Sequence, residues 1–129
     1  MRYMLMTKND PNHPITPPNP EMYAAMGKLI EEMSKAGVLL ATGGLGPNPT
    51  HVISSGGKFS ITDGPFAEAK EAVVGFALVE AKSKEEAIEF SRRFWQVAGD
   101  GAGEIYEVFG GEDLATENTE QMSFSQRSL

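Results

Sequence analysis

Residues 72–90 read AVVGFALVEAKSKEEAIEF and combine a strand with the first turns of a helix. Residues 72–81 are apolar at odd and even positions alike, which predicts a strand that is buried on both faces. Ser83 and Glu86 then have the spacing of a capping box, with Ser83 at the N-cap and Glu86 at N3. This predicts a helix that begins after Ser83 and buries a stripe formed by Ala87, Phe90 and Phe94.

The N-terminal part repeats this order of strand and helix. Residues 2–7 predict a strand that is apolar on both faces. Residues 10–20 predict a loop, because its prolines exclude regular structure. A helix is predicted from about Glu21, and Gly37 is expected to end it in a left-handed cap. Its buried stripe consists of Met22, Met26, Leu29 and Met33.

Three further strands are expected along the chain. Residues 38–42 predict a strand that leads into a glycine-rich irregular connection at 43–49. Residues 50–54 and 58–62 predict a hairpin whose turn uses the positive φ that glycine adopts readily. After the second helix, which Gly99 or Gly101 would end, residues 105–109 predict the last strand.

The order β-α-β, hairpin, β-α-β is that of a split βαβ unit, which predicts a ferredoxin-like α+β sandwich with an inserted β-hairpin. Residues 1–111 are expected to form this domain, followed by a polar, acidic tail at 112–129. Two helices cover only one face of such a sheet, yet most of its strands are apolar on both faces. A second copy of the chain is the simplest cover, which predicts a homodimer of the dimeric α+β barrel type.

The composition of the chain argues against several classes of function. The chain has 129 residues, 40% of them apolar, and a formal net charge of −7, which argues against nucleic-acid binding and polybasic membrane attachment. Its apolar runs are too short for a membrane span or a signal peptide, so a cytoplasmic location is expected. The absence of cysteine excludes thiol nucleophiles, disulfides and thiolate metal sites. No cofactor is expected, since neither a nucleotide fingerprint nor a well-placed axial histidine is present.

The segment ITDGPFAEAKE, residues 61–71, is the strongest candidate for a site. Gly64 is biased toward extended backbone by Pro65, which fixes its own φ, so a stiff turn would present Asp63 and Phe66. Asp63 is the first candidate for a catalytic acid or base, because partial burial would raise its pKa toward neutral pH. The alternative is an ordinary turn in which Asp63 accepts hydrogen bonds from its own backbone and Phe66 fills a core.

This segment and the features around it resemble the YCII-related family, in particular the branch named after its Asp-Gly-Pro-Phe motif. The features that share the family's order are residues 2–6, 36–40 and 44–47, the motif with Glu68, Lys70 and Glu71, and Gly75-Phe76. The resemblance implies a small ferredoxin-like protein that is often a dimer. Most such proteins have no assigned reaction, although one relative is a dehydrochlorinase acting on a chlorinated hydroxyquinol.

Some relatives are described with a histidine–aspartate centre whose histidine lies on the first helix, whereas this chain has no histidine in residues 21–36. His13, in the loop before that helix, is the candidate for a second catalytic group, and a solvated loop histidine is the alternative. Lys70 could bind an anionic substrate. Phe66, Tyr3 and Tyr106 could line a pocket, although strand tyrosines commonly serve packing. A metal site from His13, His51 and Asp63 is not expected, because no two of them have ligand spacing.

Two functions follow from these residues. The first is a cofactor-independent enzyme that uses Asp63 in an elimination, isomerisation or hydrolysis of a small polar organic molecule. The alternative is a non-catalytic dimeric module that binds a ligand or a regulatory protein. An enzyme should have a closed pocket on which Asp63 and another polar group converge, whereas a binding module could leave Asp63 saturated by turn amides.

Overall fold

The structure is a computed structural model that describes residues 1–63 and 72–110. Several predictions fall outside the described residues: those for Gly64, Pro65, Phe66, Lys70 and the tail at 112–129.

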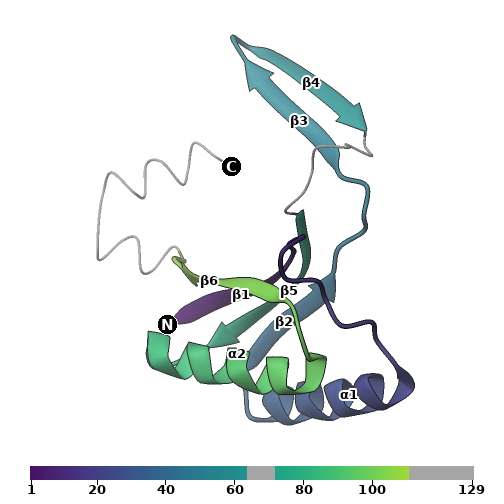
Figure 1. Ribbon diagram of the computed structural model, residues 1–129. Coiled ribbons are helices and arrows are strands. Elements are labelled where there is room, and N and C mark those ends of the chain that lie inside the picture. Colours follow the sequence, from purple (N-terminus) through teal and green to yellow (C-terminus); the bar gives the residue numbers. More distant parts are fainter. Residues whose placement is uncertain (64–71, 111–129) are drawn as a thin grey trace.

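Four strands form one antiparallel sheet in the order β2-β5-β1-β6 (Figure 1). The strands are β1 (Arg2–Asn9), β2 (Leu39–Gly44), β5 (Ala72–Glu80) and β6 (Ala102–Val108). The two strands that are apolar on both faces, β1 and β5, lie at the centre, where Tyr3 is paired with Val79. This is the strand order that a split βαβ unit produces.

Both helices, α1 (Pro20–Lys35) and α2 (Lys84–Ala98), cover the same face of this sheet (Figure 1). The core between helices and sheet centres on Val79, which is 0% exposed. The predicted helical stripes are confirmed apart from Met22, which does not pack in the core cluster. Leu29, Met33 and Ala87 are buried, and Met26, Phe90 and Phe94 pack partly buried against them. The predicted ferredoxin-like α+β fold is therefore confirmed, and within the described residues the single chain forms no closed barrel.

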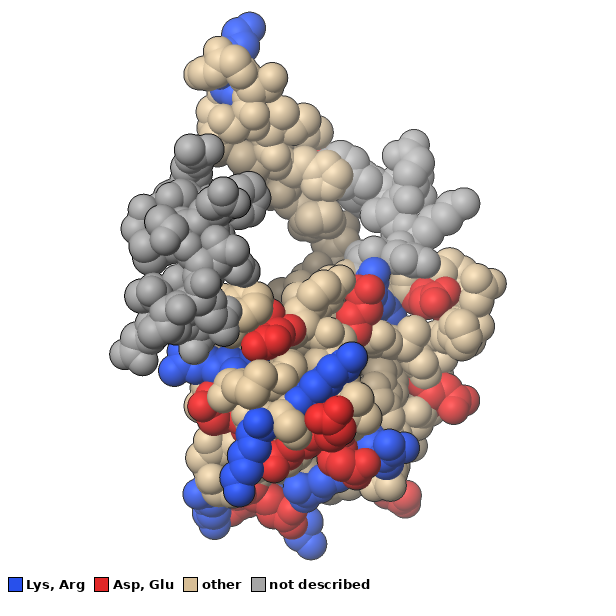
Figure 2. Space-filling model, turned by 90° about the vertical axis from the view of Figure 1, so that its left-hand side faces the viewer, with Lys and Arg blue, Asp and Glu red and all other residues tan. Residues whose placement is uncertain are grey.

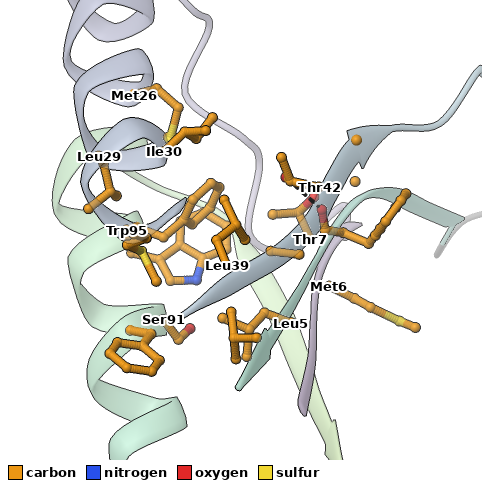
Figure 3. Close-up of a pocket in the computed structure, with 18 residues that line it drawn as sticks. Leu5, Met6, Thr7, Met26, Leu29, Ile30, Leu39, Thr42, Ser91 and Trp95 are labelled. Carbon is orange, nitrogen blue, oxygen red and sulfur yellow. Dashed lines mark hydrogen bonds between the residues drawn. The ribbon is translucent and has the colours of Figure 1, made fainter. Parts of the chain in front are cut away.

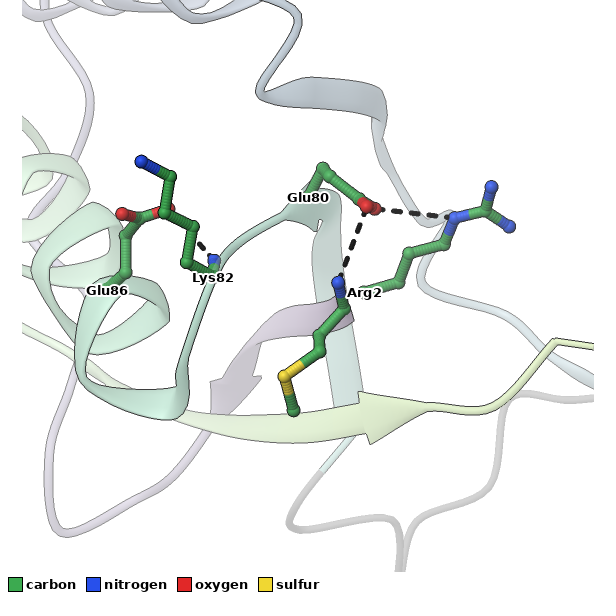
Figure 4. Close-up of polar contacts among 5 residues, drawn as sticks. Arg2, Glu80, Lys82 and Glu86 are labelled. Carbon is green, nitrogen blue, oxygen red and sulfur yellow. Dashed lines mark hydrogen bonds and ion pairs between the residues drawn. The ribbon is translucent and has the colours of Figure 1, made fainter. Parts of the chain in front are cut away.

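The ends of the helices follow the local sequence. Gly37 ends α1 with φ of +74°, as predicted. At the start of α2 the Ser83 hydroxyl accepts the amide of Glu86 at 3.2 Å, which confirms the N-cap. The reciprocal half of the predicted capping box differs, because the Glu86 carboxylate accepts the amide of Lys82 at 3.1 Å (Figure 4). The second contact of the box is thus made one residue before the N-cap.

Within residues 1–63 and 72–110, no helix covers the second face of the sheet, and we call it the open sheet face. Strand alternation and register place Met4, Met6, Phe76, Leu78 and Tyr106 on it. Figure 3 shows Met6 pointing away from the helices.

Ion pairs frame these apolar residues at both ends of the strands. Arg2 lies 3.5 Å from Glu80, which also contacts the N-terminal ammonium at 3.4 Å (Figure 4), and Lys8 lies 3.1 Å from Glu104. An apolar centre with a charged rim is the anatomy of a protein interface.

A separate hairpin consists of β3 (Thr50–Ser55) and β4 (Lys58–Asp63), as predicted. Gly56 and Gly57 form its turn with φ of +55° and +80°, which matches a type I′ turn. Figure 1 places the hairpin and the helices on opposite sides of the four-stranded sheet. The hairpin therefore stands apart from the core.

Several strand boundaries differ from the prediction by one to three residues, and two of these differences involve glycine. The last strand begins at Ala102 rather than at residue 105, and β2 continues through Gly44 instead of ending at residue 42. At Gly103 a Cβ atom would collide with the backbone oxygen of Met6. Glycine is an expected strand residue where a neighbouring backbone approaches this closely, although its strand propensity is low.

Candidate functional site

A cavity of about 230 Å³ lies between the helices and the sheet, and we call it the layer cavity (Figure 3). Leu5, Leu39 and Ala77 line it from the sheet, Met26 and Ile30 from α1, and Phe90, Phe94 and Trp95 from α2. The lining is mainly aliphatic and aromatic because both layers turn their apolar stripes inward. Such a cavity suits a molecule with an apolar or aromatic body.

A few polar groups interrupt this apolar lining. The Thr42 hydroxyl donates to the backbone oxygen of Phe76 at 2.9 Å and is therefore engaged. Thr7, Ser91 and Trp95 also line the cavity. Within residues 1–63 and 72–110, their hydroxyls and the indole N–H make no hydrogen bond. A ligand in the cavity could therefore meet two hydroxyls and one N–H donor.

A second group of polar residues lies in the loop after β1. The Asp10 carboxylate accepts the amide of Asn12 at 2.9 Å and lies 3.1 Å from Nδ1 of His13. The backbone hydrogen bond from Asn12 lowers the pKa of Asp10, and the contact with His13 lowers it further. The Asp10 side chain is 20% exposed, whereas that of His13 is 66% exposed. The loop thus holds an ionised carboxylate against a histidine that faces solvent.

His13 borders an open hollow of about 470 Å³, which we call the loop hollow. The segment 99–103 and Trp95 also line this hollow. Two hydrogen bonds join this segment to Thr16: the Thr16 amide donates to the backbone oxygen of Asp100 at 3.1 Å, and the Asp100 amide donates to the Thr16 hydroxyl at 2.7 Å. Trp95 also lines the layer cavity, so the two spaces share this residue.

Asp63 lies elsewhere, on the exposed end of β4. Its carboxylate accepts the hydroxyl of Thr50 at 2.7 Å, a partner on the neighbouring strand of the hairpin. Asp63 lines neither the layer cavity nor the loop hollow. In the single chain, Asp63 and His13 therefore belong to separate clusters.

The other predicted residues are also dispersed. Tyr3 is buried toward the helices, and burial, then Glu107, then Glu85 raise its pKa. Tyr106 lies on the open sheet face and is 50% exposed, so the two tyrosines occupy opposite faces. His51 pairs with Thr62 on the face of the hairpin that Asp63 does not share.

Sequence reasoning missed Asp10 and Trp95. The signal for Asp10 was the spacing Asp10-Pro11-Asn12-His13-Pro14, in which a short acidic side chain can reach the next two polar residues. Trp95 follows the predicted stripe residue Phe94 and packs edge-to-face on it with ring centroids 5.1 Å apart. Its position on α2 alone does not indicate that it borders two spaces.

Two further observations concern metals and membranes. In the part of the chain that the structure describes, no three His, Asp or Glu side chains gather closely enough to hold a metal ion. None of the described helices is long and apolar enough to cross a membrane.

Comparisons with known proteins place this architecture in a family. An uncharacterised protein of Rhizobium meliloti (strain 1021) is similar over a short segment, with 47% identity over 38 residues. That match covers 30% of this chain and 31% of the relative, so it spans less than a third of the relative's length. The profile of the YCII-related domain matches residues 1–111, which include every described strand and helix. The chain therefore belongs to the YCII-related family.

Proposed function

We propose that this protein binds a small organic molecule with an apolar or aromatic body and transfers a proton on it without a cofactor. The layer cavity receives the body of the molecule, and His13 is the acid or base. The observation that carries this proposal is that Trp95 borders both the layer cavity and the hollow beside the Asp10–His13 pair. An apolar space with a few polar groups at its edge is typical of small-molecule sites.

Asp10 supplies the positioning that such a histidine needs. The Asp10 carboxylate lies 3.1 Å from Nδ1 of His13. In the tautomer that carries its proton on Nδ1, the ring donates to this carboxylate and Nε2 can take a proton. The same division of roles, with a carboxylate orienting a histidine base, operates in hydrolytic triads. The reaction classes that fit a single positioned base are elimination, isomerisation and hydrolysis.

The Asp-Gly-Pro-Phe segment is part of this proposal through its place in the chain. Glu71 is bonded to Ala72, the first residue of β5, and Gly75 of the same strand lines the layer cavity. Three extended residues span about 10 Å, so Ala72 lies within about that distance of the cavity-lining Gly75. Asp63 stays a candidate for a second group in an assembled form, since it lines neither space in the single chain.

The experiment is a thermal-shift screen of phenolic, carboxylate and chlorinated aromatic compounds, followed by turnover assays on those that bind. Ser91→Leu fills part of the layer cavity and should abolish the shift, whereas Gln96→Leu, an exposed position on the same helix, should preserve it. Binding that persists equally in Ser91→Leu would place the ligand elsewhere and contradict the proposal.

For the proton transfer, His13→Gln should reduce turnover by about 10²- to 10⁴-fold while leaving the ligand-induced thermal shift in place. His51→Gln is the matched control, because the chain has 2 histidines and His51 lies on the hairpin. Equal loss in both variants would contradict the role of His13.

A non-catalytic binding module is the second candidate. The observation in its favour is that Asp63 is already satisfied by the Thr50 hydroxyl, as expected of a carboxylate with a structural role. Ligand binding without turnover, unchanged in His13→Gln, would favour this function.

We also propose that the protein is a homodimer in which a second copy covers the open sheet face. Its apolar centre and ion-paired rim support this assembly.

A further inference from the structure

The hairpin has one apolar face and one mainly polar face. Its register pairs Val52 with Ile61 and Ser54 with Phe59, which sets these four side chains on a single face. Val52, Phe59 and Ile61 are 56%, 66% and 60% exposed. We call these three residues the arm face. On the opposite side, Ile53 is the large apolar residue, opposite Ser60.

The arm face has no packing partner within the described chain. The described residues of β3 and β4 make their extensive contacts with each other and none of comparable extent with another helix or strand. A two-stranded hairpin without packing is marginally stable in water, and exposed apolar clusters of this kind mark interaction sites. The arm face therefore calls for cover from outside the single chain.

The distribution of charge also indicates that the arm face is covered from outside the single chain. In Figure 2 the hairpin is uncoloured apart from blue atoms at its tip, whereas the body carries interspersed red and blue side chains. The cation in the hairpin is Lys58, next to the turn, and the whole chain has a net charge of −7. Lys58 at its tip and Asp63 at its base leave the arm without net charge, so it can approach an acidic surface without net repulsion.

The surface area that the arm face could bury indicates which kind of partner covers it. An exposed aromatic or branched aliphatic side chain offers roughly 100 Å² at these exposures, so the arm face offers on the order of 300 Å². One arm and the surface that receives it would bury about 600 Å², which is the scale of a crystal contact. Two arms exchanged in a two-fold dimer would bury about 1,200 Å², which reaches the range of specific interfaces.

We infer that the hairpin is an exchange arm: the arm face of each copy packs on the open sheet face of a second copy. This inference rests on the proposed homodimer and specifies which segment forms its contact. The open sheet face offers the matching apolar surface, with Met4, Leu78 and Tyr106 at its centre. Thr50 and Asp63 share the side of the arm face, so the dimer carries the Asp63 carboxylate of one copy against the other.

The test compares Ile61→Ser with Ile53→Ser, which is a matched pair because both side chains are 60% exposed and lie on opposite faces of the hairpin. Sedimentation velocity over a concentration series gives the dimer dissociation constant. We expect Ile61→Ser to raise it by roughly tenfold or more and Ile53→Ser to change it by less than about threefold. Circular dichroism checks that both variants keep the fold.

A second readout uses the absence of cysteine from the chain. Ile61→Cys should react with a thiol reagent several-fold more slowly at a concentration where the protein is dimeric than where it is monomeric, whereas Ile53→Cys should react at similar rates. A dimer whose dissociation and labelling are the same for both positions would overturn the arm while leaving the homodimer intact. A wild-type protein that stays monomeric at high concentration would overturn both.

Discussion

Asp10 shows how one loop residue can organise a candidate site. One carboxylate oxygen accepts the Asn12 amide and the other contacts His13, while Pro11 and Pro14 restrict the backbone on either side. The amide of Asn12 and then His13 hold the pKa of Asp10 below its ordinary value. The ionised form is therefore favoured in the folded protein, where one of its oxygens lies 3.1 Å from Nδ1 of His13.

This lowered pKa predicts a dependence of stability on pH. Because the pKa of Asp10 is lower in the folded chain than in the unfolded one, its contribution is present above the unfolded pKa and is lost as the pH falls through the folded pKa. As the pH falls from about 5 through the ordinary titration range of aspartate, Asp10→Asn should therefore lose less unfolding free energy than the wild type. Urea denaturation at a series of pH values measures this difference. Asp100→Asn removes the same charge from the facing loop, and an equal effect in that variant would contradict the assignment.

The roles of single residues could be predicted from the sequence only in part. The proline-flanked loop predicts a positioned His13, and the structure gives this histidine a carboxylate partner, which is Asp10 rather than Asp63. Local spacing could have indicated Asp10 as the partner of His13, since it lies three residues before the histidine. The separation of Asp63 from His13 depends on the position of the hairpin relative to the sheet. The pattern of apolar residues in the sequence does not predict this position.

At the scale of elements, the long apolar patterns predicted both helices, the central strands and the hairpin, because each pattern reflects a buried face. The starting point of β6 and the continuation of β2 escaped prediction. Both depend on glycines whose neighbours come from strands distant in sequence, such as Gly103 beside Met6. The low strand propensity of glycine predicts that a strand ends at such positions. The close approach of neighbouring strands instead requires a residue without a Cβ atom there.

Two glycine substitutions distinguish the effect of close strand packing from the effect of local propensity. Gly103→Ala should destabilise the protein by about 1–3 kcal/mol, because its Cβ would collide with the Met6 backbone and push β6 away from β1. Gly27→Ala, within α1, meets nothing within 4 Å and should stabilise the protein by about 0.5–1 kcal/mol through the better helix propensity of alanine. Urea unfolding of both variants gives the two signs. Two variants of equal stability would contradict the close approach at Gly103.

At the scale of the whole molecule, the protein divides into a packed sandwich and a projecting hairpin. The core residues, the layer cavity and the Asp10–His13 pair all lie within the sandwich. The hairpin adds an exposed apolar surface and the carboxylate of Asp63. The proposed ligand site and the proposed assembly surface thus lie in different parts of the chain.

This division predicts that the sandwich folds and binds without its arm. Replacing residues 50–63 by a short Gly-Ser linker removes no residue of the buried core and should change the unfolding free energy by about 0.5 kcal/mol or less, measured per monomer at low concentration. The shorter loop adds only a small gain in closure entropy. Any compound that stabilises the wild type should still stabilise the deletion variant, because the layer cavity is lined by the sandwich. Dimerisation should be lost in the same protein, since both arms are gone. Loss of cooperative unfolding in the deletion variant would instead show that the hairpin is part of the folding core, and the separation of binding from assembly would then fail.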